Sequence, residues 1–167
     1  MKVKFQFLLK EATKDTGPIG QFECHGFIFV AEILKKESSF FKENEEYDLD
    51  VKFYCHHIFG VYKNEEEFYK EHENINPESF IPVGGFPSDP KDMSWEPTPI
   101  NWINSTVREV IDNDSIGAPD YLIFFEGSLL GLELDQVLCD KENKYRPTFA
   151  VNDIVSGIYW AEVSVEE

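Results

Sequence analysis

Basic residues are scarce in this chain of 167 residues. Its 15 lysines and arginines stand against 32 aspartates and glutamates, which gives a formal net charge of −17 at pH 7. Binding to nucleic acid or to an anionic membrane requires Lys and Arg that neutralise phosphates. The composition therefore argues against direct nucleic-acid binding and against adhesion to a membrane. A basic partner, a cation and simple solubility remain as interpretations of the acidic excess.

Long apolar runs and cysteines are also scarce. No stretch approaches the roughly 20 apolar residues that span a bilayer, and the N-terminal MKVKFQFLLKEATK alternates charged with aromatic residues. A signal peptide would need an unbroken apolar segment and a small-residue cleavage site. Three cysteines without framework spacing do not indicate a disulfide scaffold. We therefore expect a cytoplasmic protein without a membrane segment.

Aromatic residues, in contrast, are abundant. The chain has 15 Phe and 7 Tyr, and 42% of its residues are hydrophobic. This content supports a buried core, and the aromatic residues favour strands. Alternating apolar and polar residues predict strands over 3–9, 19–34, 48–62, 79–83, 100–111, 121–127, 129–138 and 151–165.

Two of these strands carry specific expectations. In the strand over 3–9, Phe5 and Phe7 are predicted to share the buried face, because the polar residues between them alternate. The stretch 19–34 is predicted to form one long strand. Its apolar phase changes at Gly26, which indicates a β-bulge there.

One short helix is predicted at about 64–72. Asn64 is a favourable N-cap, and the acidic residues 65–67 that follow suit the positive end of a helix dipole. The stretch 100–111 fits a helix face and an alternating strand about equally well. We favour a strand, because a turn-rich loop and the clear strand 121–127 follow it as in a β-hairpin.

Together these elements predict a mainly β fold, an antiparallel small barrel or OB-like sheet with one short helix. The chain is expected to form a single β-rich domain over 1–167. A loose repetition of element order leaves open two barrel-like halves, about 1–87 and 98–167.

The stretch 101–165 resembles the strand pattern of small OB-like β-barrel proteins of unknown function. The segment VNDIVSGIYW, residues 151–160, carries this resemblance as an entry into an aromatic closing strand. The resemblance implies an OB-like barrel. OB-fold proteins that bind nucleic acid use basic and exposed aromatic residues on the strand face, and the acidic surplus of this chain departs from that pattern.

The segment FYCHHIFGVY, residues 53–62, raises the question of a metal site. Cys24, Cys55 and His57 could converge from neighbouring strands, with a fourth ligand such as His72 or a carboxylate. The alternative is that the cysteines pack as small hydrophobic residues and that His57 is a hydrogen-bonded core histidine. We favour packing, and we predict no metal and no cofactor.

Catalytic interpretations are weaker still. A Cys–His nucleophile pair needs a thiolate, which the negative charge of the chain disfavours. Glu126 interrupts the strand 121–127 and would act as an acid if it pointed inward, although an outward position is favoured. The acidic loop 112–120 lacks the ligand series of a calcium site, because Ile116 takes a ligand position. We therefore predict no catalytic residues.

The functional prediction follows from the uneven charge. The span 71–140 contains 14 acidic residues and only two basic ones. We predict a non-enzymatic binding or interaction module, for example an inhibitor or immunity-type protein that covers a basic partner. The alternative is a small-ligand-binding barrel or weak hydrolase with a pocket near His57 and Glu126. The predicted partner-binding residues are Asp112, Asp114, Asp120, Glu133 and Asp135.

Overall fold

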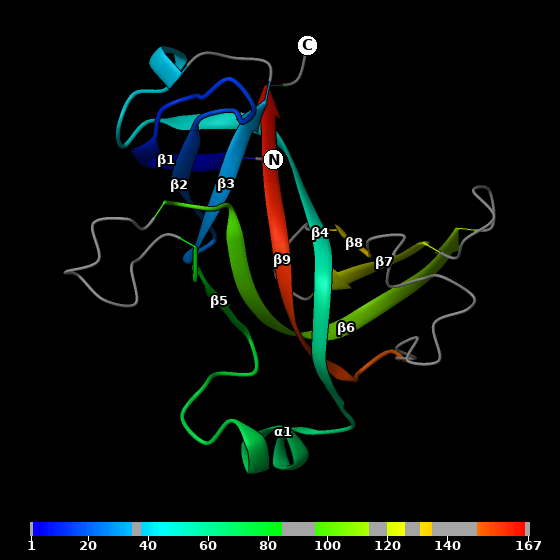
Figure 1. Ribbon diagram of the computed structural model, residues 1–167. Coiled ribbons are helices and arrows are strands. Elements are labelled where there is room, and N and C mark those ends of the chain that lie inside the picture. The colour runs from blue at the N-terminus through cyan, green and yellow to red at the C-terminus, as the bar shows by residue number, and fades with distance from the viewer. Residues whose placement is uncertain are drawn as a thin grey trace. The chain divides into compact units, whose positions relative to one another are not determined.

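The computed structural model describes residues 2–34, 38–84, 96–113, 120–125, 131–134 and 150–165. For Cys55 and for residues 109–134 this description is confined to the backbone. The strands are β1 (Lys2–Lys10), β2 (Ile19–Cys24), β3 (Phe27–Leu34), β4 (Glu46–Tyr62), β5 (Ser79–Ile81), β6 (Ile100–Asn113), β7 (Asp120–Phe125), β8 (Gly131–Leu134) and β9 (Ile154–Val165) (Figure 1). The helices are α1 (Glu65–Glu71) and a 3₁₀ turn, η1 (Ser38–Phe40).

The predicted fold class is confirmed. The described chain is mainly β, with one α-helix, and most strand pairs are antiparallel. Among the pairings whose register is described, those of β3 with β9 and of β4 with β8 are parallel. Hydrogen-bonded neighbours run in the order β1-β2-β3-β9-β4, and β1 also pairs with β4, so that five strands form a ring.

Two compact units divide the chain, and each combines stretches that are distant in sequence. Unit 1 contains residues 1–51, 80–101 and 160–167, and unit 2 contains residues 52–79 and 102–159. Strands β4, β6 and β9 contribute residues to both units. The single domain, and its division into two sequence halves, stay predictions.

In unit 1, the stretch predicted as one bulged strand is a β-hairpin. Strands β2 and β3 pair antiparallel from Ile19–Glu32 to Cys24–Phe27, with only His25 and Gly26 between them. Both turn residues have positive φ, 50° and 82°. Such a conformation suits a two-residue hairpin turn, because it matches the twist of the flanking strands. The change of apolar phase at Gly26 therefore marks a chain reversal.

The core of unit 1 is aromatic. Phe22 is fully buried. The centroid of its ring lies 5.4 Å from that of the Phe5 ring, 5.6 Å from that of Phe29 and 6.0 Å from that of Phe41. Phe7 does not join them and is 37% exposed. The register of β1 against β2 shifts between Phe5 and Phe7, so the expected alternation is interrupted there.

A buried carboxamide supports strand β3 in unit 1. Asn101 is completely buried, and its Oδ1 accepts a hydrogen bond of 2.8 Å from the backbone N–H of Val30. Its Nδ2 donates to the carbonyl oxygen of Val30, also at 2.8 Å. One side chain thereby satisfies both backbone polar groups of a fully buried residue.

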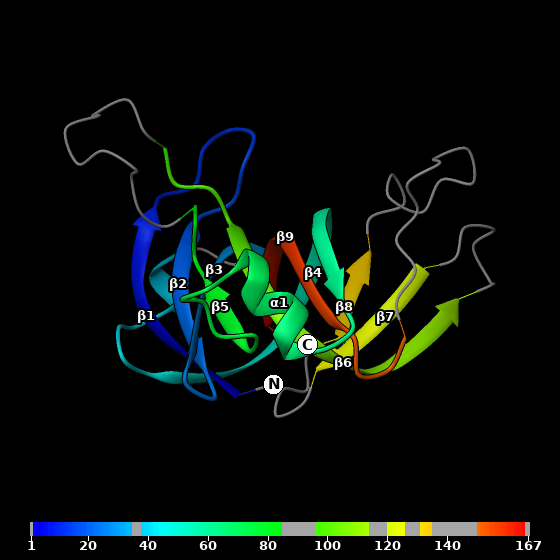
Figure 2. The same cartoon turned by 90° about the horizontal axis from the view of Figure 1, so that it is seen from below.

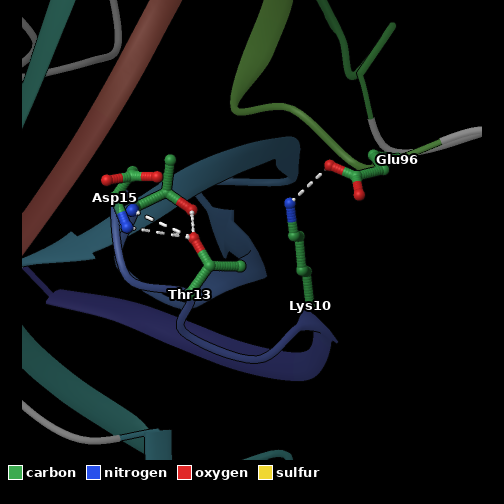
Figure 3. Close-up of polar contacts among 5 residues, drawn as sticks. Lys10, Thr13, Asp15 and Glu96 are labelled. Atoms are coloured by element: carbon green, nitrogen blue, oxygen red, sulfur yellow. Dashed lines mark hydrogen bonds and ion pairs between the residues drawn. The ribbon is translucent and has the colours of Figure 1, made fainter.

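The connection after β1 is organised by local hydrogen bonds (Figure 3). Thr13 Oγ1 accepts from the backbone N–H of Asp15 and of Thr16, at 3.3 and 3.1 Å. Lys10 Nζ donates to Glu96 Oε2 at 2.8 Å, and this contact lowers the pKa of the Glu96 carboxyl. Exposed ion pairs of this kind add little to stability. These contacts therefore define the conformation of the loop more than they stabilise the fold.

In unit 2, the ambiguous stretch from residue 100 onward is a strand. β6 pairs antiparallel with β7, from Val107–Phe125 to Asn113–Asp120, as the hairpin interpretation predicted. β8 pairs antiparallel with β7 and parallel with β4. Figure 2 shows β6, β7 and β8 side by side.

The helix prediction is confirmed in detail. Asn64 is the N-cap of α1, and its Oδ1 accepts from the backbone N–H of Glu67 at 2.9 Å. Glu67 Oε2 in turn accepts from the backbone N–H of Lys63 at 2.9 Å. This reciprocal arrangement resembles a capping box, and it fixes the Glu67 side chain at the start of the helix.

Gly157 lies where β9 passes close to β4 in unit 2. A Cβ atom at this position would lie 2.7 Å from the carbonyl oxygen of His57. Because that oxygen belongs to the backbone, a larger residue would force the strands apart. Gly157 therefore permits the close approach of the two strands.

Candidate interaction site

Acidic residues that are distant in sequence lie on adjacent strands of unit 2. The pairing of Asn113 with Asp120 and of Asp112 with Tyr121 places Asp112 and Asp120 in neighbouring rows at one end of the β6–β7 hairpin. Glu133 on β8 pairs with Leu122 of β7, one row further along. Three of the five predicted partner-binding residues thus occupy three consecutive strands.

The remaining predicted residues of this region cannot be placed in the same way. Asp114, Asp135 and Glu126 lie outside the described residues, as does most of the acidic loop 112–120. The pocket suggested near His57 and Glu126 therefore stays a prediction.

A polar cluster that the sequence analysis did not identify joins the end of β4 to α1. Tyr62 is 5% exposed, and its hydroxyl donates to Glu71 Oε2 at 2.7 Å. The same hydroxyl lies 2.9 Å from His72 Nε2, so the phenol oxygen can accept a hydrogen bond from an imidazole N–H while its own O–H donates to Glu71. Glu71 and His72 are thereby oriented at the end of the helix.

An open hollow of about 340 Å³ lies beside this cluster. Its lining residues come from the last part of β4 and from α1. They are Phe59, Gly60, Val61, Tyr62, Glu67, Lys70 and Glu71. A volume of this size lies at the lower end of the range typical of ligand pockets, about 300–1,000 Å³.

Aromatic rings continue from the hollow across unit 2. The Phe59 ring meets that of His57 at 5.1 Å and that of Trp102 at 6.1 Å, both edge to face. Trp102 also meets the His72 ring at 5.7 Å, and its Nε1 donates to Ser156 Oγ at 2.8 Å. These contacts hold Phe59 in place although its side chain is 51% exposed.

The segment that carries the OB-like resemblance forms a well-bonded turn in unit 2. Asp153 is buried, and its Oδ2 accepts from the backbone N–H of Ala150 at 2.9 Å and from Lys63 Nζ at 2.8 Å. Asn152 has a φ of 75°, which asparagine tolerates better than most residues. Val107 exchanges backbone hydrogen bonds of 2.8 Å with Asn152 and Asp153. This bonding gives the motif a structural role at the start of β9.

The candidate metal ligands occupy different surroundings. Cys24 is buried in unit 1, its Sγ lies 3.6 Å from the carbonyl oxygen of Lys2, and burial raises the pKa of its thiol. His57 is exposed, so the alternative interpretation of a core histidine was wrong. Phe53 is buried, whereas His57 and Phe59, which follow in the same alternation along β4, are exposed. The side chain of Cys55 is not described.

Among the side chains that the structure describes, no group of three His, Cys, Asp or Glu residues is arranged to hold a metal ion. The site suggested from Cys24, Cys55 and His57 includes a side chain that is not described, so it is not tested by this observation. A separate observation concerns membranes: in the same ranges, no helix is both long and apolar enough to cross a bilayer.

Tyr62 makes a testable contribution to stability at alkaline pH. Burial and the neighbouring Glu71 raise the pKa of Tyr62 above its ordinary value of about 10. The raised pKa means that the contribution is complete below pH 10 and is lost as the pH rises beyond it, because the unfolded chain ionises first. We expect the free energy of unfolding to fall above pH 10 more steeply in the wild type than in Tyr62→Phe.

Urea denaturation of both proteins at pH 8 and pH 11 measures this difference. The Tyr62 contribution to the slope is at most about 1.4 kcal/mol per pH unit. Tyr69→Phe, which alters an exposed tyrosine of α1, is the control and should keep the wild-type slope. Identical slopes for wild type and Tyr62→Phe would contradict the assigned environment.

Comparison of the chain with protein-family models, with curated proteins and with solved structures finds no match in any of the three.

Proposed function

We propose that this protein is a non-enzymatic interaction module that binds a basic partner protein through acidic residues of unit 2. The observation that carries the proposal is the strand register. It puts Asp112, Asp120 and Glu133 in three successive rows of three neighbouring strands, with Asp120 and Glu133 on one face of the sheet and Asp112 on the other, although they are up to 21 residues apart in sequence.

The charge of the chain supports the same function. A formal net charge of −17 favours association with basic partners and accelerates their encounter at low salt. The net negative charge concentrates in the span 71–140, where 14 acidic residues stand against only two basic ones, and this span includes β6, β7 and β8. An inhibitor or immunity-type protein for a basic toxin or nucleic-acid enzyme is the concrete form of this function.

The proposal is tested with a defined basic probe. Fluorescein-labelled hexa-lysine is titrated with the protein, and binding is followed by fluorescence anisotropy at increasing NaCl concentrations. We expect the affinity to fall steeply with salt, because exposed charges are screened. The triple variant Asp112→Asn, Asp120→Asn and Glu133→Gln should weaken binding about tenfold or more at low salt.

The matched control removes the same charge elsewhere. Asp15→Asn, Glu43→Gln and Glu46→Gln alter three exposed residues of unit 1. If the acidic strands of unit 2 are the contact surface, this control should lose much less affinity than the first variant. Equal losses would show that overall charge alone attracts the probe, and they would refute a localised site.

A further inference from the structure

We propose that the hollow between β4 and α1 is a recognition pocket for an arginine side chain of the basic partner. This inference deepens the proposed function and rests on it. The hollow belongs to unit 2, as do the acidic strands, but it uses entirely different residues.

Two carboxylates of the hollow are each held by one oxygen. Glu67 Oε2 accepts from the backbone N–H of Lys63, and Glu71 Oε2 accepts from the Tyr62 hydroxyl. Neither Oε1 atom makes a hydrogen bond or ion pair within the described chain. Because the two residues are four positions apart on α1, they share one helix face. The pocket therefore presents oriented acceptors to a ligand with several N–H donors.

The third charged residue of the lining is already paired. Lys70 Nζ lies 3.3 Å from Glu66 Oε1, one helical turn away and outside the lining. The lining itself contains two acids and one base, so it favours a cation over an anion. No phosphate or carboxylate ligand would find an unpaired base in these surroundings.

The aromatic wall favours arginine over lysine. Phe59 lines the hollow, its side chain is 51% exposed, and its ring is supported by the rings of His57 and Trp102. A planar guanidinium stacks on an aromatic face and donates in parallel to carboxylate oxygens, whereas an ammonium group is compact and strongly hydrated. The combination of a supported ring with two oriented carboxylates matches the guanidinium.

The test uses N-acetyl-arginine amide as the probe and ¹⁵N NMR spectra of the full chain as the readout. We expect its addition at low salt to shift the backbone amide signal of Gly60, which lines the hollow, and the indole N–H signal of Trp102. N-acetyl-citrulline amide has nearly the same shape without the charge and should shift neither signal. N-acetyl-lysine amide should bind several-fold more weakly than the arginine probe.

Variants separate the pocket from general acidity. Glu71→Gln should weaken the arginine probe about tenfold, as expected for loss of a hydrogen bond to a charged group. Glu65→Gln removes the same charge from the first turn of α1 but does not line the hollow, so it should change the affinity less than twofold. Phe59→Ala alters an exposed ring and provides a second variant in case Glu71→Gln disturbs the fold.

The outcomes distinguish the two proposals. If hexa-lysine binds through the acidic strands but Glu71→Gln and Glu65→Gln affect the arginine probe equally, the pocket is refuted and the proposed function stands. Equal shifts with the citrulline probe would also refute the pocket. If neither hexa-lysine nor the arginine probe binds, both proposals fail.

Discussion

Replacement of Phe22 by alanine is expected to lower the free energy of unfolding by roughly 3–5 kcal/mol, the usual cost of truncating a buried phenylalanine. Phe22 is completely buried at the centre of the aromatic core of unit 1. Its ring meets those of Phe5, Phe29 and Phe41 within about 6 Å. Truncation removes apolar contact area and leaves a cavity among these three rings. The strands β1, β2 and β3 are held by backbone hydrogen bonds, so they close this cavity only in part.

Urea denaturation followed by circular dichroism measures this loss. Phe40→Ala is the matched control, because Phe40 contacts Phe41 but is 43% exposed. The control should cost less than about 1 kcal/mol, since little area is removed from the interior. Similar losses for the two variants would show that Phe22 does not occupy the centre of the core.

Replacement of Asn101 by alanine is expected to cost roughly 2–5 kcal/mol. The side chain satisfies both the N–H and the carbonyl oxygen of Val30, and both residues are completely buried. A buried polar group without a partner costs about 1–3 kcal/mol. This substitution leaves two such groups, the N–H and the carbonyl oxygen of Val30, without a partner. The predicted loss is large for a side chain of this size.

Amide hydrogen exchange gives a local readout of this prediction. The Val30 N–H should exchange faster in Asn101→Ala under conditions in which the global stability is still high. Asn101→Asp keeps an acceptor for the Val30 N–H but removes the donor and buries a charge, so it should be at least as destabilising. Unchanged protection of Val30 in the alanine variant would disprove the bridging role of Asn101.

The sequence predicts those elements that depend on near neighbours. Asn64 and the three glutamates that follow it are sufficient to locate α1, because capping is a local interaction. The strand at Ile100–Asn113 can be inferred from the loop and the clear strand that follow it, with which it forms a hairpin. The turn at His25–Gly26 was missed because histidine is less typical of such turns than asparagine or aspartate, although a central glycine within an apolar stretch was a usable signal.

The parts that the sequence does not predict depend on distant partners. Nothing near Asn101 in the chain indicates that it bonds to Val30, 71 residues away. The burial of Tyr62 and its bonds to Glu71 and His72 depend on how α1 folds back on the end of β4. The interpretation of His57 as a core histidine depends on the alternation of residues along the strand 48–62. Alternation does not show at which residue of a long strand burial ends.

The interleaving of the two units has a consequence for biosynthesis. The last strand of unit 1 begins at Trp160 and pairs with β3 through Glu32–Leu34. The two partners are about 130 residues apart in sequence, so the ribosome must synthesise all the intervening residues before β3 can pair with β9. Unit 1 therefore forms completely only after the residues from Trp160 onward have been synthesised, and truncation before Trp160 would leave an edge of β3 open to association with other chains.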